Sequence, residues 1–545
     1  MRPMCLVIAA ALAFQSALTA QRPDSLSITV DELAGRLRFF SSDLFEGRGP
    51  GTRGETLATA YLISELRTFG VRPGAANGWL QPVSIVTHQP APEAPIAIRL
   101  SGRVTRALEH GRDIRLANYT AAPDVEAGGE LVFVGYGIDA PIYQWNDFAS
   151  LDLHGKIAVV LPGEPHITSD SVRFNGLRAS RYSDFFEKTI EIERRGAVGM
   201  VVIRPAGSLA KTPPSGPRRL AAGATSATLR FVGGITDSVL ATLLPPGARS
   251  SGLGALIQTA GRPGFRAVPL GVRLDVTFHT RPATVVTHNV VGVVPGTDSG
   301  VAAEHVVLSA HWDHLGIGTP VNGDSIYNGA LDDGSGITAL LALSRVFAHH
   351  PQRRSLTLLF TTAEEWGLLG AEAFACSGPV PPERIVANLN LDDGTELLGR
   401  SRDVAPLGSE LSTLGRVIED EARRKGLKVS PDPYPQEGFF LRADNFSFAR
   451  AGIPALYMAL GLDTEGQPAG TTKGRMDTYL ETHYHQPSDE YDTVVVDLRG
   501  SQQFAEFVRD AAIAVANATE RPEWLRGAEF SRAGTATACP TRSRP

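Results

Sequence analysis

An apolar run that ends in two adjacent acids is the feature that most constrains how this chain can fold. Residues 355–360 read Ser-Leu-Thr-Leu-Leu-Phe, and Thr361-Thr362-Ala363-Glu364-Glu365-Trp366 follow. A strand this apolar is covered on both faces, as in parallel sheets. Burying two carboxylates at its end is costly unless a cation or a proton compensates their charge. Ligands of open α/β sheets lie beyond the carboxyl ends of strands, so Glu364 and Glu365 are candidate site residues. The alternative is an acidic start to a solvated helix.

Histidines and further acids stand at comparable places elsewhere in the chain. Two apolar runs, 305–310 and 385–391, are each followed directly by such residues, and a glycine-rich turn carries another acid into an apolar helix. Imidazole and carboxylate groups without cysteine form a donor set that suits Zn²⁺. An acid shared between two metals would let five protein ligands serve a pair of ions. The motifs are His311-Trp312-Asp313-His314, Asn328-Gly329-Ala330-Leu331-Asp332-Asp333-Gly334, Asp392-Asp393 and Tyr484-His485-Gln486-Pro487-Ser488-Asp489.

Together with Glu364-Glu365, these motifs resemble the co-catalytic di-zinc peptidases of metallopeptidase family twenty-eight. The relatives of that family include bacterial leucyl aminopeptidases and glutamate carboxypeptidases. The resemblance implies two Zn²⁺ ions per chain. It implies that one zinc is bound by His311 and Asp392, the other by Glu365 and His485, and that Asp332 bridges both.

The same resemblance assigns catalytic roles to three more residues. Glu364 falls on the general base, which takes a proton from the attacking water and returns it to the departing amine. Asp313 matches the acid that hydrogen-bonds the ligand His311 from behind. Tyr484 resembles the tyrosine that helps to hold the oxyanion. Two zinc ions about 3.5 to 4 Å apart hold the water and lower its pKa, so no covalent nucleophile is expected.

Other residues near these motifs have competing interpretations. His314 is an alternative ligand, but the family pattern uses the first histidine and the acid two residues on. Asp333 and Asp393 follow proposed ligands, and we expect them to support their loops. Asp444 occupies a motif in which relatives usually carry a serine before the acid and a histidine after it. This chain carries neither, so substrate contacts in that loop cannot be transferred.

Length and composition predict more than one domain. A chain of 545 residues exceeds what one hydrophobic core usually serves. Its 43% hydrophobic and 20% charged residues are ordinary for a globular protein, and a net charge of -6 gives no support for nucleic-acid binding. Apolar runs and helical patterns alternate after 285, which predicts an α/β fold with a mainly parallel mixed sheet sandwiched by helices. The resemblance implies the zinc-peptidase, phosphorylase/hydrolase-like version of this fold.

We expect the catalytic domain to be discontinuous. Its two parts would be 21–122 and 285–525, the first containing a motif at 41–48 that resembles the N-terminal signature of the same peptidases. Between them, 123–284 form a smaller β-rich α/β insert that resembles a protease-associated domain. Arginine, threonine, serine and proline are frequent over 526–545, which predicts a weakly ordered tail.

The first twenty residues read as an export signal, with an apolar stretch from Cys5 to Phe14 and small residues before Gln21. This predicts a secreted or periplasmic protein with a cleaved signal peptide; an uncleaved anchor is the alternative. The stretch is shorter than the roughly 20 residues of a membrane span. Cys376 and Cys539 then remain, and in an oxidising compartment they can pair. The sequence leaves that pairing open.

We therefore expect a secreted zinc-dependent exopeptidase that acts on peptides, most simply an aminopeptidase. The alternatives are a carboxypeptidase-type relative, a glutaminyl-cyclase-like acyltransferase with a single zinc, and a non-catalytic binding protein like the transferrin receptor ectodomain. The last should lack the ligands that this sequence keeps. Side-chain specificity, the direction of cleavage and the oligomeric state stay open, as does the metal, since cobalt or manganese satisfy similar groups.

Overall fold

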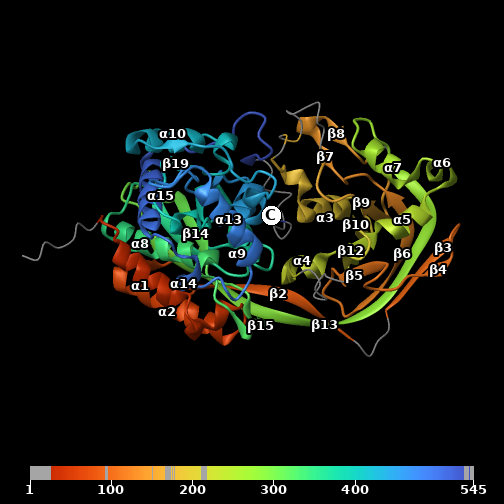
Figure 1. Cartoon of the computed structure of the whole chain (residues 1–545), viewed down its shortest axis with the longest axis horizontal. Coiled ribbons are helices and arrows are strands. Elements are labelled where there is room, and N and C mark those ends of the chain that lie inside the picture. The colour runs from red at the N-terminus through yellow and green to blue at the C-terminus, as the bar shows by residue number, and fades with distance from the viewer. Residues whose placement is uncertain are drawn as a thin grey trace, which may run out of the picture.

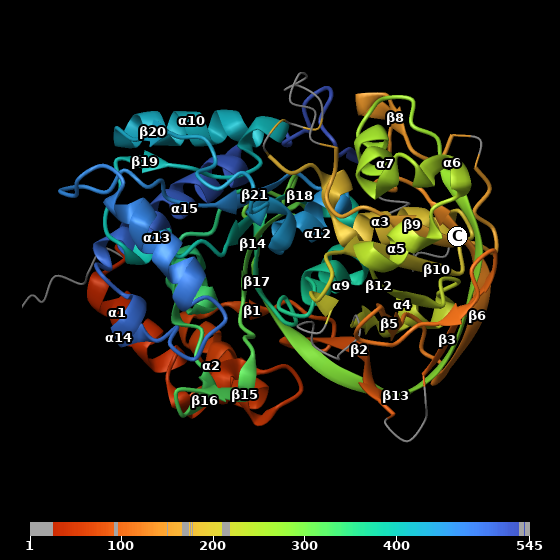
Figure 2. The ribbon, with the colours of Figure 1, turned by 45° about the vertical axis from the view of Figure 1, so that its right-hand side comes forward.

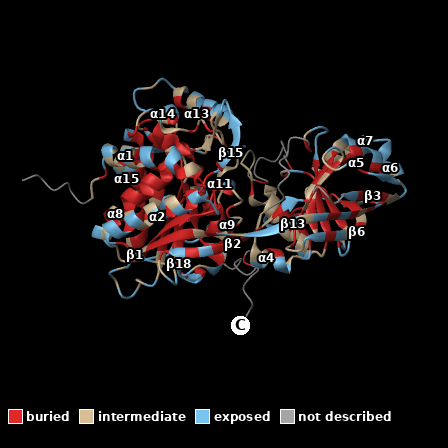
Figure 3. Ribbon diagram, turned by 90° about the horizontal axis from the view of Figure 1, so that it is seen from below, coloured by how far each residue is buried: buried red, intermediate tan, exposed pale blue. Residues whose placement is uncertain are grey.

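The computed structural model of the chain forms two lobes, each with a buried core of its own (Figures 1 and 3). It describes residues 26–91, 96–149, 151–165, 178–209 and 218–532, together with Phe174, Gly176 and Cys539. The export signal predicted over 1–20 lies outside these residues. We call residues 26–91 and 280–532 the larger lobe and residues 96–279 the insert.

The larger lobe is built on a mixed sheet with a parallel centre. Its strand order is β21-β18-β14-β17-β13, with β2 and β1 pairing on β13. The first four strands are parallel neighbours, and β13 joins them antiparallel. The strands are β1 (Arg72–Pro73), β2 (Leu80–Pro90), β13 (Val268–Val294), β14 (His305–His311), β17 (Ser355–Thr361), β18 (Ile385–Leu391) and β21 (Ala455–Met458).

Helices cover both faces of this sheet because its central strands are apolar on both sides. All seven residues of β17 are buried, with Leu356, Leu358 and Phe360 facing one core and Leu359 the other. The first core is packed by α1 (Val30–Phe40), α2 (Arg53–Phe69), α8 (Ser335–His349), α10 (Leu414–Lys425) and α15 (Arg499–Asn517), and the second by α9 (Leu369–Ser377) and α12 (Asn445–Arg450). The predicted mainly parallel sheet between helix layers is thus confirmed.

The insert is a second α/β unit. Its strands β6, β9, β10 and β12 are parallel neighbours, while β5 and β13 close the sheet antiparallel at its two sides. The elements are β3 (Ala97–Gly102), β4 (Arg106–Ala107), β5 (Ile114–Asn118), β6 (Asp124–Phe133), β9 (Ile157–Val160), α3 (Phe185–Arg194), β10 (Gly199–Arg204), β11 (Arg219–Leu220), α4 (Ala221–Ser226), β12 (Phe231–Thr236), α5 (Asp237–Leu243), α6 (Pro246–Arg249) and α7 (Gly252–Ala260).

One strand is shared by both lobes. The first part of β13 pairs with β3 and β6 in the insert, its middle pairs with β2, and its last residues pair with β17 in the larger lobe. Figures 1 and 2 show it as a continuous green arc running from one lobe into the other. The domain boundary predicted at 284/285 lies inside this strand, so the two sheets are joined by ordered backbone.

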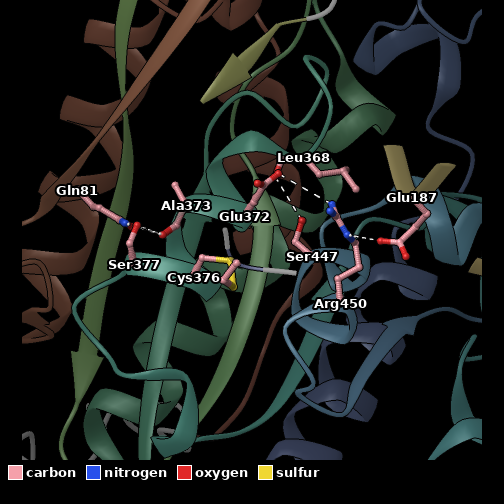
Figure 4. Close-up of a disulfide and its surroundings, with 10 residues drawn as sticks. Gln81, Glu187, Leu368, Glu372, Ala373, Cys376, Ser377, Ser447 and Arg450 are labelled. Carbon is pink, nitrogen blue, oxygen red and sulfur yellow. Dashed lines mark hydrogen bonds and ion pairs between the residues drawn. A yellow bond between two sulfur atoms is a disulfide. The ribbon is translucent and has the colours of Figure 1, made fainter. Parts of the chain in front are cut away.

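A disulfide joins Cys376 in α9 to Cys539, with Cα atoms 5.3 Å apart and a sequence separation of 163 (Figure 4). The pairing that the sequence left open is therefore formed. Inside the predicted tail, Phe530 is also buried in the core next to α9. Arg532 donates to the backbone oxygens of Ile385 and Val386.

Candidate metal centre

The residues predicted to form the site are delivered by one edge of the larger sheet. His311 ends β14, Asp392 follows β18, and the loop after β17 carries Glu364 and Glu365. Because β14, β17 and β18 are parallel neighbours, their carboxyl ends meet at this edge. Two further segments reach the same place: the turn before α8, and the loop after α13 (Thr471–Thr482), which is followed by α14 (Tyr491–Val494).

Asp332 lies between the two predicted ligand histidines. Its Oδ1 is 3.2 Å from Nε2 of His311, and its Oδ2 is 3.2 Å from Nε2 of His485. His311 Nε2 is also 3.5 Å from Oδ1 of Asp392, and His485 Nε2 is 3.0 Å from Oε2 of Glu365. The structure therefore brings all five predicted ligands together, with one carboxylate presenting an oxygen to each side.

Burial and crowding set the protonation of this cluster. The pKa of Glu364 is raised well above its usual range, first by burial and then by the charges of neighbouring acids, although His311 opposes them. Burial also pushes the pKa of Glu365 upward, but His314 and His485 outweigh it and bring that pKa to about 2. Burial with nearby acids likewise raises the pKa of Asp392. A bound cation would stabilise the ionised form of carboxylates that are packed this closely.

The backbone is left-handed at two non-glycine positions that aim site residues. Ala363, with φ 52°, precedes the adjacent acids, and His485 itself has φ 57°. Such a conformation costs of order 1–3 kcal/mol and persists only where surrounding contacts impose it. The loop after β17 is held in this way by Asn289, whose side-chain oxygen accepts the backbone N–H of Thr362 and whose amide donates to Gly370.

Asp313 differs from its expected arrangement. Its carboxylate Oδ1 is 4.0 Å from Nδ1 of His311, while that ring nitrogen lies 3.0 Å from the backbone oxygen of Asp313. The carboxylate instead accepts the backbone N–H of Glu364 at 3.2 Å. It is fully buried, and burial raises the pKa of Asp313 to about 8. Asp313 thus contacts His311 through its backbone oxygen and the loop of the predicted base through its carboxylate.

His314 lies closer to the centre than the sequence analysis expected. Its Nδ1 is 2.6 Å from Oε1 of Glu365, and the residue is fully buried. Two sets of ligand atoms lie within 4.8 Å of one another among the described residues: those of His311, Asp332 and Asp392, and those of His314, Asp332 and Glu365. The signal for His314 was present in the His-Trp-Asp-His motif, but the family pattern favoured its first histidine.

Two supporting residues were not singled out from the sequence. Asp489 accepts the backbone N–H groups of Leu331 and Asp332 at 2.9 and 3.2 Å, and it accepts the Tyr479 hydroxyl at 3.1 Å. Arg48 is fully buried and donates to the backbone oxygens of Trp312, Phe40, Asn328 and Gly329. Both residues hold the turn that carries Asp332, the predicted bridging ligand. Each belongs to a motif that the sequence analysis used, but neither was assigned a role there.

The acids expected to support loops have such partners. Asp333 accepts the backbone N–H groups of His311 and Gly336, both at 3.0 Å. Asp393 accepts the Thr395 hydroxyl and the backbone N–H of Leu460.

A cavity opens beside the centre. His311, Asp332, Glu364, Asp392 and Tyr484 line it together with mostly apolar and aromatic side chains. The Tyr484 hydroxyl accepts a hydrogen bond from Nη2 of Arg442 at 3.1 Å, and burial raises the pKa of that hydroxyl. The apolar part of the wall includes Leu331, Leu407, Phe439, Tyr457, Leu460, Met476 and Leu480.

The donor atoms fit divalent cations. The cluster supplies imidazole nitrogens and carboxylate oxygens, the ligands that suit Zn²⁺ in the absence of cysteine. Oε1 of Glu365 and both ring nitrogens of His314 are buried without a hydrogen bond of acceptable geometry among the described residues. Buried polar atoms of this kind are usually partnered, and metal coordination would provide the partner.

Comparison with known proteins identifies the family of this segment. Residues 289–512 match the model described as peptidase family M28. Over these residues the chain is similar to peptidase family M28. The M28 segment contains β14, β17, β18 and all eight residues predicted for the site. A probable leucine aminopeptidase 2 of Aspergillus oryzae is 28% identical over 162 residues, which are 28% of this chain and 30% of that protein. A vacuolar membrane protease of Candida albicans is 36% identical over 88 residues, 16% of this chain and 9% of that protein.

Solved structures are similar over most of their length. An aminopeptidase from Aneurinibacillus sp. strain AM-1 is 19% identical, with 91% of this chain and 96% of that chain covered and a TM-score of 0.49. BSAP, a zinc aminopeptidase from Bacillus subtilis, is 17% identical, with 93% and 98% covered and a TM-score of 0.43. The match spans less than a third of the curated relatives named above. No helix among the described residues of this protein has the length and apolar character needed to cross a membrane.

Proposed function

We propose that this M28 protein is a zinc-dependent exopeptidase, and specifically an aminopeptidase. The observation that carries the proposal is the placement of Asp332, whose two oxygens face His311 and His485 from opposite sides. A carboxylate in that position can be shared by two ions. His311 and Asp392 would complete one site, and Glu365 with His485 the other.

His314 adds an alternative to this ligand assignment. It contacts Glu365 on the side opposite to His485, since the two histidines face different oxygens of that carboxylate. We assign His485 as the ligand and His314 as the residue that orients Glu365. Bound zinc would supply Lewis acidity and a water of lowered pKa at this centre.

The residues of the chain itself divide the remaining chemistry. Glu364 lines the cavity beside the ligands and holds the proton that moves from the water to the departing amine. The Tyr484 hydroxyl, kept in place by Arg442, donates to the oxygen of the attacked carbonyl. Asp313 fixes the backbone N–H of Glu364 and so the position of the base.

The apolar cavity supports an aminopeptidase with a preference for apolar first residues. Its lining of leucine, methionine and aromatic side chains would bury one apolar side chain next to the centre. The name of the Aspergillus oryzae relative, probable leucine aminopeptidase 2, agrees with this substrate class. Free-amine substrates such as leucyl peptides are therefore the first to assay.

We further propose that the protein acts outside the cytoplasm. The export signal predicted over 1–20 supports this, and so does the disulfide between Cys376 and Cys539, since such bonds persist in oxidising compartments. The insert would then be the protease-associated domain that its sequence resembles, placed beside the centre by β13.

The test is a Glu364→Gln variant assayed on leucyl substrates, with N-blocked leucyl substrates as the control. We expect the wild type to cleave only the free-amine set, to bind two zinc ions per chain and to lose activity on chelation. The variant should keep the zinc content and turn over at least ~100-fold more slowly, because only proton transfer is lost. A fully active variant would remove the assigned role, and a stoichiometry near one zinc would favour the cyclase alternative.

A further inference from the structure

The insert packs against the loop that carries Glu364 and Glu365. Strand β11 of the insert pairs with β2 and contacts α9, the helix that begins right after this loop. Phe186, in α3 of the insert, lies over Gly367, so that a Cβ atom there would be only 3.1 Å from the Phe186 ring. Figure 2 shows α9 at the boundary with the insert. The loop of the proposed base is therefore partly walled by insert residues.

Within this contact an arginine of the insert lies beside the loop that carries Glu364 and Glu365. The guanidinium of Arg218 lies 4.2 Å from the centroid of the Trp366 ring, and Trp366 directly follows Glu365. Burial lowers the pKa of Arg218, while the carboxylates of Asp313 and Glu365 act in the opposite direction. These two acids belong to the centre, so the cation lies within electrostatic reach of it.

Arg218 has no ion-pair partner among the residues that the structure describes. Asp313 and Glu365 attract its positive charge, but neither pairs with it. Asp313 accepts the backbone N–H of Glu364, and Glu365 contacts His314 and His485. The negative charge of the ligands would be matched by two divalent ions. A guanidinium stacked on an indole keeps its N–H edge free, and that edge matches a carboxylate in a bidentate way.

We propose that Arg218 is a specificity-determining residue that binds a carboxylate on the leaving-group side of the substrate. This inference rests on the proposed aminopeptidase function. The cavity beside the centre is the place for the first residue of the peptide, and Arg218 is not part of its wall. The part of the substrate that follows the cleaved bond and leaves as the amine would lie outside that cavity. Arg218 would contact this part next to Trp366.

Two sources can supply such a carboxylate. In a dipeptide it is the C-terminal carboxylate, and in a longer peptide it is an acidic side chain on the second residue. Four substrates separate these cases: leucyl-glycine, leucyl-glycinamide, leucyl-aspartamide with a free side chain, and leucyl-asparaginamide. The first and third carry a carboxylate, and the second and fourth are their uncharged partners.

The experiment measures kcat/KM of each substrate for the wild type and for Arg218→Ala, Arg218→Lys and Arg266→Ala. Arg266 is an exposed arginine of the same insert and serves as the charge-matched control. Removing a charge-assisted hydrogen bond should lower kcat/KM for the carboxylate substrates about 10- to 100-fold through KM. The amide substrates should change less than about 2-fold, and Arg218→Lys should recover part of the loss.

Loss on leucyl-glycine alone would identify the C-terminal carboxylate, and loss on leucyl-aspartamide alone would identify the side chain. An equal loss on carboxylate and amide substrates would overturn the proposal, because a purely structural Arg218 lowers all four together. No loss on any substrate would overturn it as well. A wild type that cleaves none of the four substrates would refute the proposed function itself, a result distinct from either of these.

Discussion

Removing the disulfide between Cys376 and Cys539 should lower the stability of the larger lobe more than most single changes would. The bond ties α9 to a residue beyond the last described helix, and both cysteines are buried, with exposed fractions of 7% and 3%. The chain between them includes β18, β21, α10, α12 and α15, so much of the lobe lies inside the closed loop. Replacing both residues by alanine removes the bond without burying a new polar group.

The expected size follows from the length of the closed loop. For a separation of 163 residues, chain entropy alone predicts about 5 kcal/mol of stabilisation through the unfolded state. A unit of roughly 320 residues unfolds with an entropy of about 0.7 kcal/mol/K near 60 °C. The Cys376→Ala/Cys539→Ala variant should therefore melt about 7 °C below the wild type.

Calorimetry of both proteins, with and without a thiol reductant, measures this difference. The reductant should lower the Tm of the wild type toward that of the double variant and leave the double variant unchanged. A Tm shift below about 2 °C in the double variant would refute the reasoning. It would mean that the segment ending at Cys539 separates from the lobe before the lobe unfolds, so that the loop is not part of the cooperative unit.

Two further predictions concern the insert. Burial raises the pKa of Glu164 from 4.5 to about 7, against the opposing hydrogen bonds from Ser180. The folded state holds this proton more tightly than the unfolded state. The bound proton therefore contributes about 3 kcal/mol to the free energy of unfolding below pH 4.5, and this contribution is lost as the pH rises through 7. Urea midpoints at pH 5 and 8 should show this fall in the wild type and a smaller one in Glu164→Gln; equal falls would contradict the assignment. Arg450→Met should cost about 3 kcal/mol, because it removes the buried Arg450 and leaves the partly buried Glu187 with only Arg181, and adding Glu187→Gln should restore part of it in a double-mutant cycle. Additive losses would show that the pair is not coupled.

The centre of the larger lobe could be predicted from the sequence because its signals are local. The strands β14, β17 and β18 correspond to the apolar runs within a few residues, and α8 is the apolar helix expected after the glycine-rich turn. Parallel strands place their carboxyl ends together, so residues that follow β14, β17 and β18 had to converge. The convergence of His485 and Asp332 with them came from the family resemblance, since neither follows a strand of the sheet.

What the sequence did not indicate depends on contacts between distant segments. The 27 residues of β13 contain a stretch, 280–288, that is largely exposed, and no local pattern says that one strand runs through two sheets. The position of Asp313 could not be read either, because its carboxylate bonds a backbone N–H fifty-one residues away in the chain. The sequence likewise showed His314 within the His-Trp-Asp-His motif, but it could not show that the ring of His314 contacts Glu365.

The shared strand also explains how an insert can contribute to the centre. Two domains joined by flexible linkers move relative to each other unless their interface is large, and a side chain on one would then be poorly placed for a substrate on the other. Here β13 is hydrogen-bonded to β2 and β17 on one side and to β3 and β6 on the other, so bending it would break ladder bonds in both lobes. The partly buried ion pair between Glu187 and Arg450 adds a second connection on the other side of α9 (Figure 4). With both connections in place, the ring of Trp366 and the guanidinium of Arg218 keep a defined separation, which is the condition for selecting a substrate carboxylate.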